Sequence, residues 1–123
     1  MPTPKPYSDA VSRDGWIYLS GKTGAVSDGT LPEDFALQSV QAMLNVRDAL
    51  LAAKASLSDV VKVTVFLTSM DDYSEFNEIY VQFFPETKPA RSCVAVSGLP
   101  RGAKVEVEAV AFIDGPAGRE SVN

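Results

Sequence analysis

Two short segments of this 123-residue chain carry side chains suited to anion binding or acid–base chemistry. The segment PARSCVAV carries Arg91 and, two residues later, the only cysteine, Cys93; the segment KVEVE carries Glu106 and Glu108. Successive side chains of a strand point to opposite faces, so each pair shares one face of its predicted strand. A guanidinium can grip a carboxylate through two parallel hydrogen bonds, and a glutamate can hold and polarise a water molecule. These residues are therefore the first candidates for a functional site.

Each of these residues also has an ordinary structural explanation. Arg91 can simply neutralise Glu106 or Glu108 across the sheet, an explanation at least as strong on physical grounds alone. Cys93 can be a small buried apolar residue, and the chain has no histidine to activate it as a nucleophile. The lack of histidine also removes the usual general base and most zinc sites, so no metal is expected.

The stretch Ser20-Gly21-Lys22-Thr23 contains the GKT of a phosphate-binding loop. Five residues separate Gly15 from Gly21, where that motif needs four, and GAVSDGT follows in place of a helix. A nucleotide-binding loop is therefore excluded here.

Composition sets the class of protein. The 46% of hydrophobic residues is typical of one globular domain, and the net charge of −5 argues against binding to a nucleic acid backbone. No apolar run is long enough to cross a bilayer, and the first ten residues lack the apolar stretch of a signal peptide. A single cysteine cannot form an intramolecular disulfide, which favours a cytoplasmic protein with no membrane partner.

Turn signals and hydrophobic periodicity predict strand, strand, helix, strand, helix, strand, strand. The predicted hairpin turns at Asp14-Gly15, and the first helix follows Pro32. Tyr73, Phe76, Asn77, Tyr80 and Phe84 form one stripe of the second helix. The predicted ranges are 12–21 for the hairpin, 33–53 and 71–84 for the helices, and 59–69, 89–98 and 104–113 for the remaining strands. This order indicates an α+β fold with a mixed sheet and both helices on one face.

The alternation along the last two strands suggests which side chains form the core. Ser92, Val94 and Val96 are expected on the core face. Arg91 and Cys93 are expected on the opposite face, beside Glu106 and Glu108, whereas Val105, Val107, Ala109 and Ala111 should point toward the helices. A second face that is half polar and half apolar suggests burial between subunits.

Considered together, these segments resemble the Rid/YjgF family of imine and enamine deaminases, formerly described as endoribonucleases or translation inhibitors. The resemblance extends from Pro6 to about Ala111. Its most specific block is Pro89–Ala109, with PARSCV, Leu99-Pro100 and KVEVEA. Its other pieces are Pro6-Tyr7, YLSG (18–21), Asn45-Val46, VVKVTVFL (60–67) and FNEIY (76–80).

The resemblance implies a chorismate-mutase-like fold over residues 1–113, with a flexible tail at 114–123. It implies a homotrimer whose sheets face inward and an active site in each cleft between subunits. The implied substrates are 2-aminoacrylate, 2-aminocrotonate and their imine tautomers, which would be hydrolysed to 2-oxo acids and ammonia without a cofactor or metal.

The resemblance also implies roles for individual residues. Arg91 would anchor the substrate carboxylate and Glu106 would hold the hydrolytic water. The residues implied to line the pocket are Tyr7, Ser20 and Cys93, with Asn77 at its edge. Desolvation would raise the pKa of Glu106 and Arg91 would lower it, and the sequence leaves the balance open. The chain departs from the family pattern at Lys5, Lys22, Thr23 and Ala95, which bears on substrate size more than on reaction type.

Two other functions stay open at this point. A trimer that binds small carboxylates or a protein partner without chemistry would share Arg91 but would place no demand on Glu106. An endoribonuclease is less well supported, because the chain is acidic and lacks histidine.

Overall fold

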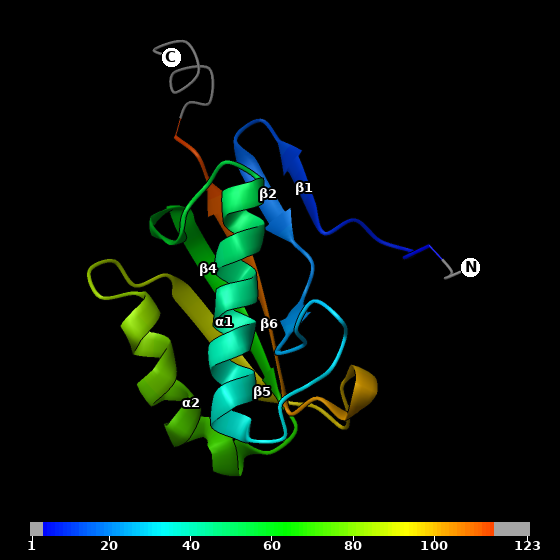
Figure 1. Ribbon diagram of the computed structural model, residues 1–123. Coiled ribbons are helices and arrows are strands. Elements are labelled where there is room, and N and C mark those ends of the chain that lie inside the picture. The colour runs from blue at the N-terminus through cyan, green and yellow to red at the C-terminus, as the bar shows by residue number, and fades with distance from the viewer. Residues whose placement is uncertain (1–3, 115–123) are drawn as a thin grey trace.

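The structure is a computed structural model that describes residues 4–114, and it follows the expected element order with one addition (Figure 1). The strands are β1 Ala10–Arg13, β2 Trp16–Leu19, β3 Lys22–Thr23, β4 Val60–Leu67, β5 Ala90–Ala95 and β6 Val105–Phe112, and the helices are α1 Phe35–Ala52 and α2 Tyr73–Tyr80. Apart from Asp114, the tail expected at 114–123 lies outside the described residues. No helix in the described part is long and apolar enough to cross a membrane.

The predicted hairpin at Asp14-Gly15 is confirmed. β1 and β2 pair antiparallel, and Arg13 lies opposite Trp16 at the turn. Both turn residues have positive φ, 49° at Asp14 and 89° at Gly15. Two positive φ values define the tight hairpin turn whose twist matches that of paired strands, which is why the Asp-Gly dipeptide was a reliable signal.

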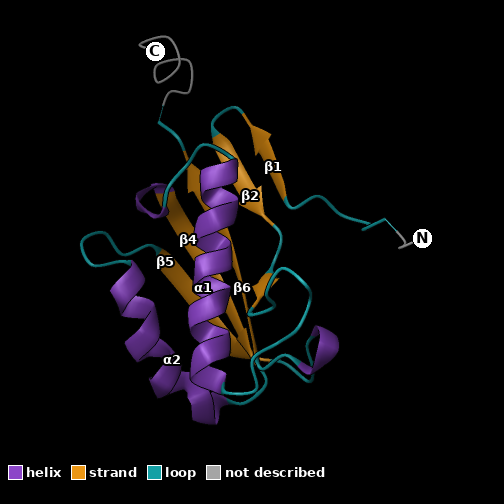
Figure 2. Cartoon of the chain, in the orientation of Figure 1, coloured by secondary structure: helices purple, strands orange, loops and turns teal. Residues whose placement is uncertain are grey.

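The sheet is mixed, as predicted, with the order β1-β2-β6-β4-β5 and with β3 beside β6. β4 and β5 run parallel, and the other pairs are antiparallel. Both helices lie on the same side of this sheet (Figure 2). The sequence did not predict β3, because two residues are too few to show an alternating pattern.

The hydrophobic core lies between the helices and the sheet. Asp34 caps α1 by accepting a hydrogen bond from the backbone N–H of Leu37 at 3.1 Å. The predicted second helix is α-helical only from Tyr73 to Tyr80, with a 3₁₀ turn before it and another after it. Its aromatic stripe is confirmed: the rings of Tyr80 and Phe84 have centroids 5.0 Å apart. The fully buried side chains include Ile17, Met43, Val46, Leu50, Val63, Val65, Leu67, Phe76, Val105 and Val107.

The expected face assignment of β5 is wrong. In the register with β4, Arg91 lies beside Val63 and Cys93 beside Val65, and both valines are buried under the helices. Val94, expected in the core, is 44% exposed. The prediction that Arg91 and Cys93 share one face of β5 was correct. Alternation alone does not say which face meets the helices, and the valines of β5 suggested the wrong face.

The two glutamates lie where they were expected, on the face away from the helices. Glu106 pairs with Phe66 and Glu108 with Thr64, and Phe66 in turn pairs with Val94. Arg91 and Cys93 are therefore on the opposite face of the sheet from both glutamates. The expectation that the four side chains share one face is wrong for a single chain.

A buried amide joins α1 to the strand that carries the glutamates. Gln38 is 3% exposed, and its Nε2 donates to the Pro32 carbonyl at 2.8 Å. Its Oε1 accepts a hydrogen bond from the backbone N–H of Lys104 at 2.9 Å, directly before β6. Because the side chain is satisfied on both sides, its burial is tolerated, and it fixes the beginning of β6 against α1.

Gly24 is packed against the backbone of α1, and this contact gives a test of the fold. A Cβ at Gly24 would lie 2.7 Å from the Cα of Gln38, and a helix backbone cannot move aside as a flexible side chain can. We expect Gly24→Ala to lower the free energy of unfolding by about 1–3 kcal/mol, the usual range for overpacking. Gly98→Ala is the matched control, because a Cβ there meets nothing within 4 Å. Urea unfolding of both variants checks this, and equal stabilities would contradict it.

Candidate functional site

The predicted site residues, together with neighbours that the sequence did not predict, form two groups on opposite faces of the sheet. The first, the arginine group, consists of Arg91 and Cys93 on β5 with Tyr73 and Tyr80 on α2. The second, the glutamate group, consists of Glu106 and Glu108 on β6 with Tyr7, Ser20 and Gly21.

In the arginine group the guanidinium lies against two tyrosines. Arg91 Nη2 donates to the Tyr73 hydroxyl at 3.3 Å, and its Cζ lies 4.8 Å from the ring centroid of Tyr80. Within residues 4–114, none of the ion pairs involves Arg91. The explanation that Arg91 neutralises Glu106 or Glu108 is therefore wrong within one chain, and the positive charge remains available.

Cys93 lies two residues after Arg91 on the same face of β5, and Asn77 lies on the helix whose tyrosines contact this arginine. Burial raises the pKa of the Cys93 thiol, and the charge of Arg91 opposes that shift only in part. A raised pKa lowers the thiolate fraction, which is unfavourable for a nucleophile. Asn77 lies on α2 between Tyr73 and Tyr80, and within the described residues its buried Oδ1 has no hydrogen-bond partner.

The glutamate group borders a cavity of about 700 Å³. Tyr7, Ser20, Gly21, Glu106 and Glu108 all line it, so three of the predicted site residues are close together. Burial raises the pKa of Glu106, and the negative charge of Glu108 raises it further. Arg91 lies on the other face and does not lower this pKa. The sequence left open whether the pKa of Glu106 is raised or lowered, and in the single chain it is raised.

Ser20 holds the N-terminal arm, residues 4–9, against the end of β2. Its Oγ donates to the Ser8 carbonyl at 2.6 Å, and its backbone N–H donates to the Asp9 carbonyl at 3.0 Å. This arm carries Tyr7, which is 56% exposed in the single chain. Ser20 therefore also places Tyr7 beside the cavity.

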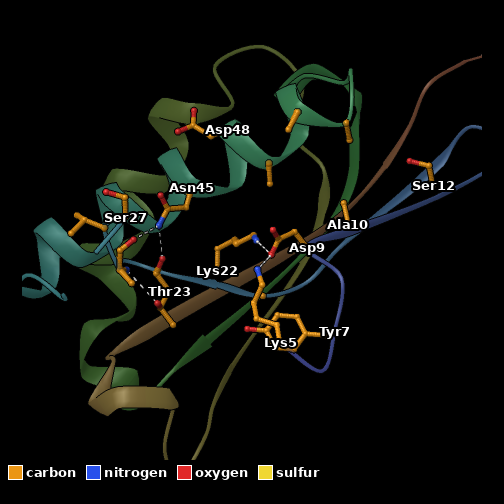
Figure 3. A pocket seen from close by; sticks show the side chains of 16 residues that line it. Lys5, Tyr7, Asp9, Ala10, Ser12, Lys22, Thr23, Ser27, Asn45 and Asp48 are labelled. Atoms are coloured by element: carbon orange, nitrogen blue, oxygen red, sulfur yellow. Dashed lines mark hydrogen bonds and ion pairs between the residues drawn. The ribbon is translucent and has the colours of Figure 1, made fainter. Parts of the chain in front are cut away.

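A second cavity, of about 720 Å³, adjoins the first. Three residues that depart from the family pattern, Lys5, Lys22 and Thr23, line it. Figure 3 shows Lys5 from the arm and Lys22 from β3 both pointing toward Asp9. The Nζ atoms of Lys5 and Lys22 lie 2.5 and 3.4 Å from the Oδ1 of Asp9. The bond from Lys5 and the charge of Lys22 lower the pKa of Asp9. The Asn45 amide donates to the carbonyls of Thr23 and Ala25 at 2.9 and 2.8 Å, which fixes β3 against α1.

Comparison with known proteins decides the family. The sequence profile described as "Endoribonuclease L-PSP" matches residues 1–113. The chain belongs to the Rid/YjgF/L-PSP family. The 2-iminobutanoate/2-iminopropanoate deaminase of Bos taurus is 41% identical over 113 residues, which cover 90% of this chain and 82% of the bovine protein.

Solved structures of proteins with similar sequences share the fold. RidA from the Antarctic bacterium Psychrobacter sp. PAMC 21119 aligns with a TM-score of 0.86 at 37% identity, covering 91% of this chain and 92% of RidA. E. coli TdcF with bound serine aligns with a TM-score of 0.86 at 35% identity, covering 91% of both chains. The predicted α+β fold with a mixed sheet and two helices is therefore confirmed, and its structural neighbours make it YjgF-like.

Several neighbours of the site were not predicted as site residues in this Rid-family chain. Tyr73 and Tyr80 belonged to a recognised aromatic stripe, but their contact with Arg91 depends on the register of β5. Gly21 was noted only as part of the stretches Ser20–Thr23 and YLSG. A glycine directly after Ser20 was the one sign in the sequence that another side chain, here Glu106, approaches the backbone closely at this position. The ion cluster at Asp9 depends on how the arm folds back, which no periodicity reveals.

Gly21 is needed for the close approach of Glu106 to β3. A Cβ at Gly21 would overlap the Oε2 of Glu106, a side-chain end that is free to move. We expect Gly21→Ala to leave the melting temperature nearly unchanged but to displace the carboxylate, with turnover lowered roughly 10- to 100-fold. Thermal melts measure the first effect, and the rate of the imine hydrolysis proposed below measures the second. A variant with full activity would show that the position of Glu106 is unimportant.

Proposed function

We propose that this Rid-family chain hydrolyses 2-imino acids and their enamine tautomers, such as 2-aminoacrylate and 2-aminocrotonate, to 2-oxo acids and ammonia. The observation that carries this proposal is a half-buried Arg91 whose charge is not neutralised by any acid within the described chain. Such a guanidinium is suited to a ligand carboxylate. The bovine relative named as a 2-iminobutanoate/2-iminopropanoate deaminase and TdcF with bound serine support the same class of small carboxylate ligand.

The reaction needs a water, a base and a fixed substrate. Arg91 would bind the carboxylate, with Cys93 and Asn77 beside it and Tyr7 and Ser20 on the other wall. A water held by Glu106 would attack the imine carbon and give up a proton to the carboxylate. Glu106 would pass that proton to the nitrogen, which gives a carbinolamine. Glu106 would then take the proton of the carbinolamine hydroxyl and deliver it to the amino group as the C–N bond breaks, so that ammonia and the 2-oxo acid leave. No cofactor is required, because water is the only other reactant.

A single chain separates Arg91 from Glu106, so we propose that a homotrimer completes the site between subunits. The sheet face opposite α1 and α2 supports this assembly. It exposes large apolar groups, with Trp16 at 39%, Tyr18 at 49% and Val94 at 44%. Such a patch favours burial against another copy. With the sheets facing inward, the glutamate group of one subunit would meet the arginine group of the next.

Glu106 provides the main test of the chemistry. The substrate is produced in place by adding the protein to a threonine dehydratase reaction and following 2-oxobutanoate and ammonia. We expect Glu106→Gln to lower turnover roughly 10²- to 10⁴-fold while pyruvate binding is retained, because an amide cannot accept the proton of water. The raised pKa of Glu106 predicts that kcat/KM falls as the pH drops, beginning above the ordinary glutamate value.

Glu108→Gln and Cys93→Ser are the controls for this experiment. Glu108 lies on the same face as Glu106, and Glu108→Gln should lower turnover less than Glu106→Gln does. Cys93→Ser should keep most of the activity, because the raised pKa of the Cys93 thiol makes it a poor nucleophile. Intact turnover in Glu106→Gln would favour the non-catalytic carboxylate-binding trimer. Cleavage of RNA that is lost in Glu106→Gln would favour the endoribonuclease.

Mixed trimers test whether the site is shared. Arg91→Lys keeps the charge but loses the planar fork, so alone it should lower kcat/KM for imine hydrolysis by roughly 10²-fold or more. Arg91→Lys and Glu106→Gln are unfolded together in equal amounts and refolded. If adjacent subunits supply the two residues, about one site in four is wild type at both positions, and a corresponding share of activity returns. Light scattering must report trimers; a stable monomer, or no recovery in mixed trimers, would rule out a shared site.

A further inference from the structure

The guanidinium of Arg91 is held by aromatic side chains where an acid would be the usual partner. The Tyr73 hydroxyl accepts a hydrogen bond from Nη2 at 3.3 Å. The Cζ lies 4.8 Å from the ring centroid of Tyr80 and 5.6 Å from that of Tyr73. Arg91 is thus in contact with α2 on two sides, and both contacts are with neutral groups.

This arrangement fixes the arginine without using up its charge. An arginine presents several N–H donors in one plane, and Tyr73 accepts only one of them. A ring face attracts a cation through its quadrupole and occupies no N–H group. An aspartate or glutamate would hold Arg91 more tightly, but it would compete with the carboxylate of a ligand.

The two tyrosines contact Arg91 through different parts of the side chain. Tyr73 uses its hydroxyl as well as its ring. Tyr80 is 7% exposed, and within the described residues its hydroxyl has no hydrogen-bond partner, so its ring alone meets the arginine. Burial raises the pKa of Tyr80 to about 12, against the influence of Arg91, so the phenol is neutral at any working pH.

We propose that Tyr73 and Tyr80 are positioning residues that orient the Arg91 guanidinium toward the substrate carboxylate, Tyr73 through its hydroxyl and Tyr80 through its ring face. The inference rests on the proposed function, in which Arg91 binds that carboxylate. The carboxylate does not change during hydrolysis, so loss of this orientation weakens substrate and transition state alike. The effect should therefore be seen in KM and in ligand affinity more than in kcat.

Two chemically identical substitutions separate the roles. Tyr73→Phe removes the hydroxyl that contacts Arg91, and Tyr80→Phe removes a hydroxyl that does not. We expect Tyr73→Phe to raise both the KM for the imine and the Kd for pyruvate about 3- to 10-fold, the scale of one hydrogen bond, with kcat within about twofold. Tyr80→Phe should leave both constants within about twofold. Tyr80→Leu removes the ring face and should raise both constants, so Tyr80→Phe is also the conservative rescue.

Calorimetry with pyruvate measures the affinity without turnover, and pyruvamide is the control ligand because it lacks the carboxylate. Tyr73→Phe should weaken pyruvate and leave any binding of pyruvamide unchanged. A Tyr73→Phe trimer that matches an active wild type in KM and Kd would overturn the inference while the proposed function stands. Equal losses in Tyr73→Phe and Tyr80→Phe would overturn it too, by assigning the effect to packing. A wild-type protein that neither hydrolyses imines nor binds pyruvate would contradict the proposed function itself.

Discussion

The alternation of side chains along β6 determines the face of the sheet on which Glu106 and Glu108 lie. Val105, Val107 and Ala111 are fully buried beneath the helices, and their burial forces Glu106 and Glu108 to the opposite face. A slip of one residue would place two carboxyl groups in the core, at a cost of the same order as the whole stability of a small domain. The core of the fold therefore also fixes the face on which the acid–base group lies.

The same constraint shapes the electrostatics of Glu106. Within residues 4–114 of a single chain the sheet separates Glu106 from Arg91, so no cation of that chain offsets its partial burial, and Glu108 adds repulsion. A carboxyl group whose pKa is higher in the folded than in the unfolded chain binds more protons when folded. Stability contributed by that proton is present at low pH and lost as the pH rises through the raised pKa. The neutral-pH fold thus carries a poorly stabilised carboxylate, as a general base requires.

Local signals in the sequence predicted most of the fold. The Asp14-Gly15 turn, the aromatic stripe of α2 and the valines of β6 each depend on short-range rules, and each was correct. The orientation of β5 was wrong because Val94 looked like core, whereas the parallel register with β4 places Cys93 against the buried face. Site residues carried over from the family were placed in two groups, but their mutual arrangement depends on contacts that no single strand encodes.

The arginine group shows where the chain departs from the rules that stabilise a fold. A buried Tyr80 hydroxyl that finds no hydrogen-bond partner among residues 4–114 costs about 1–3 kcal/mol, and a phenylalanine would avoid that loss. A half-buried arginine without an acid is likewise a poor choice for stability alone, since a carboxylate on α2 would satisfy it. Both departures lie where Arg91 on β5 meets the tyrosines of α2. Two such departures beside one cation, where neutral groups surround it and leave its charge free, are the pattern expected of a binding site.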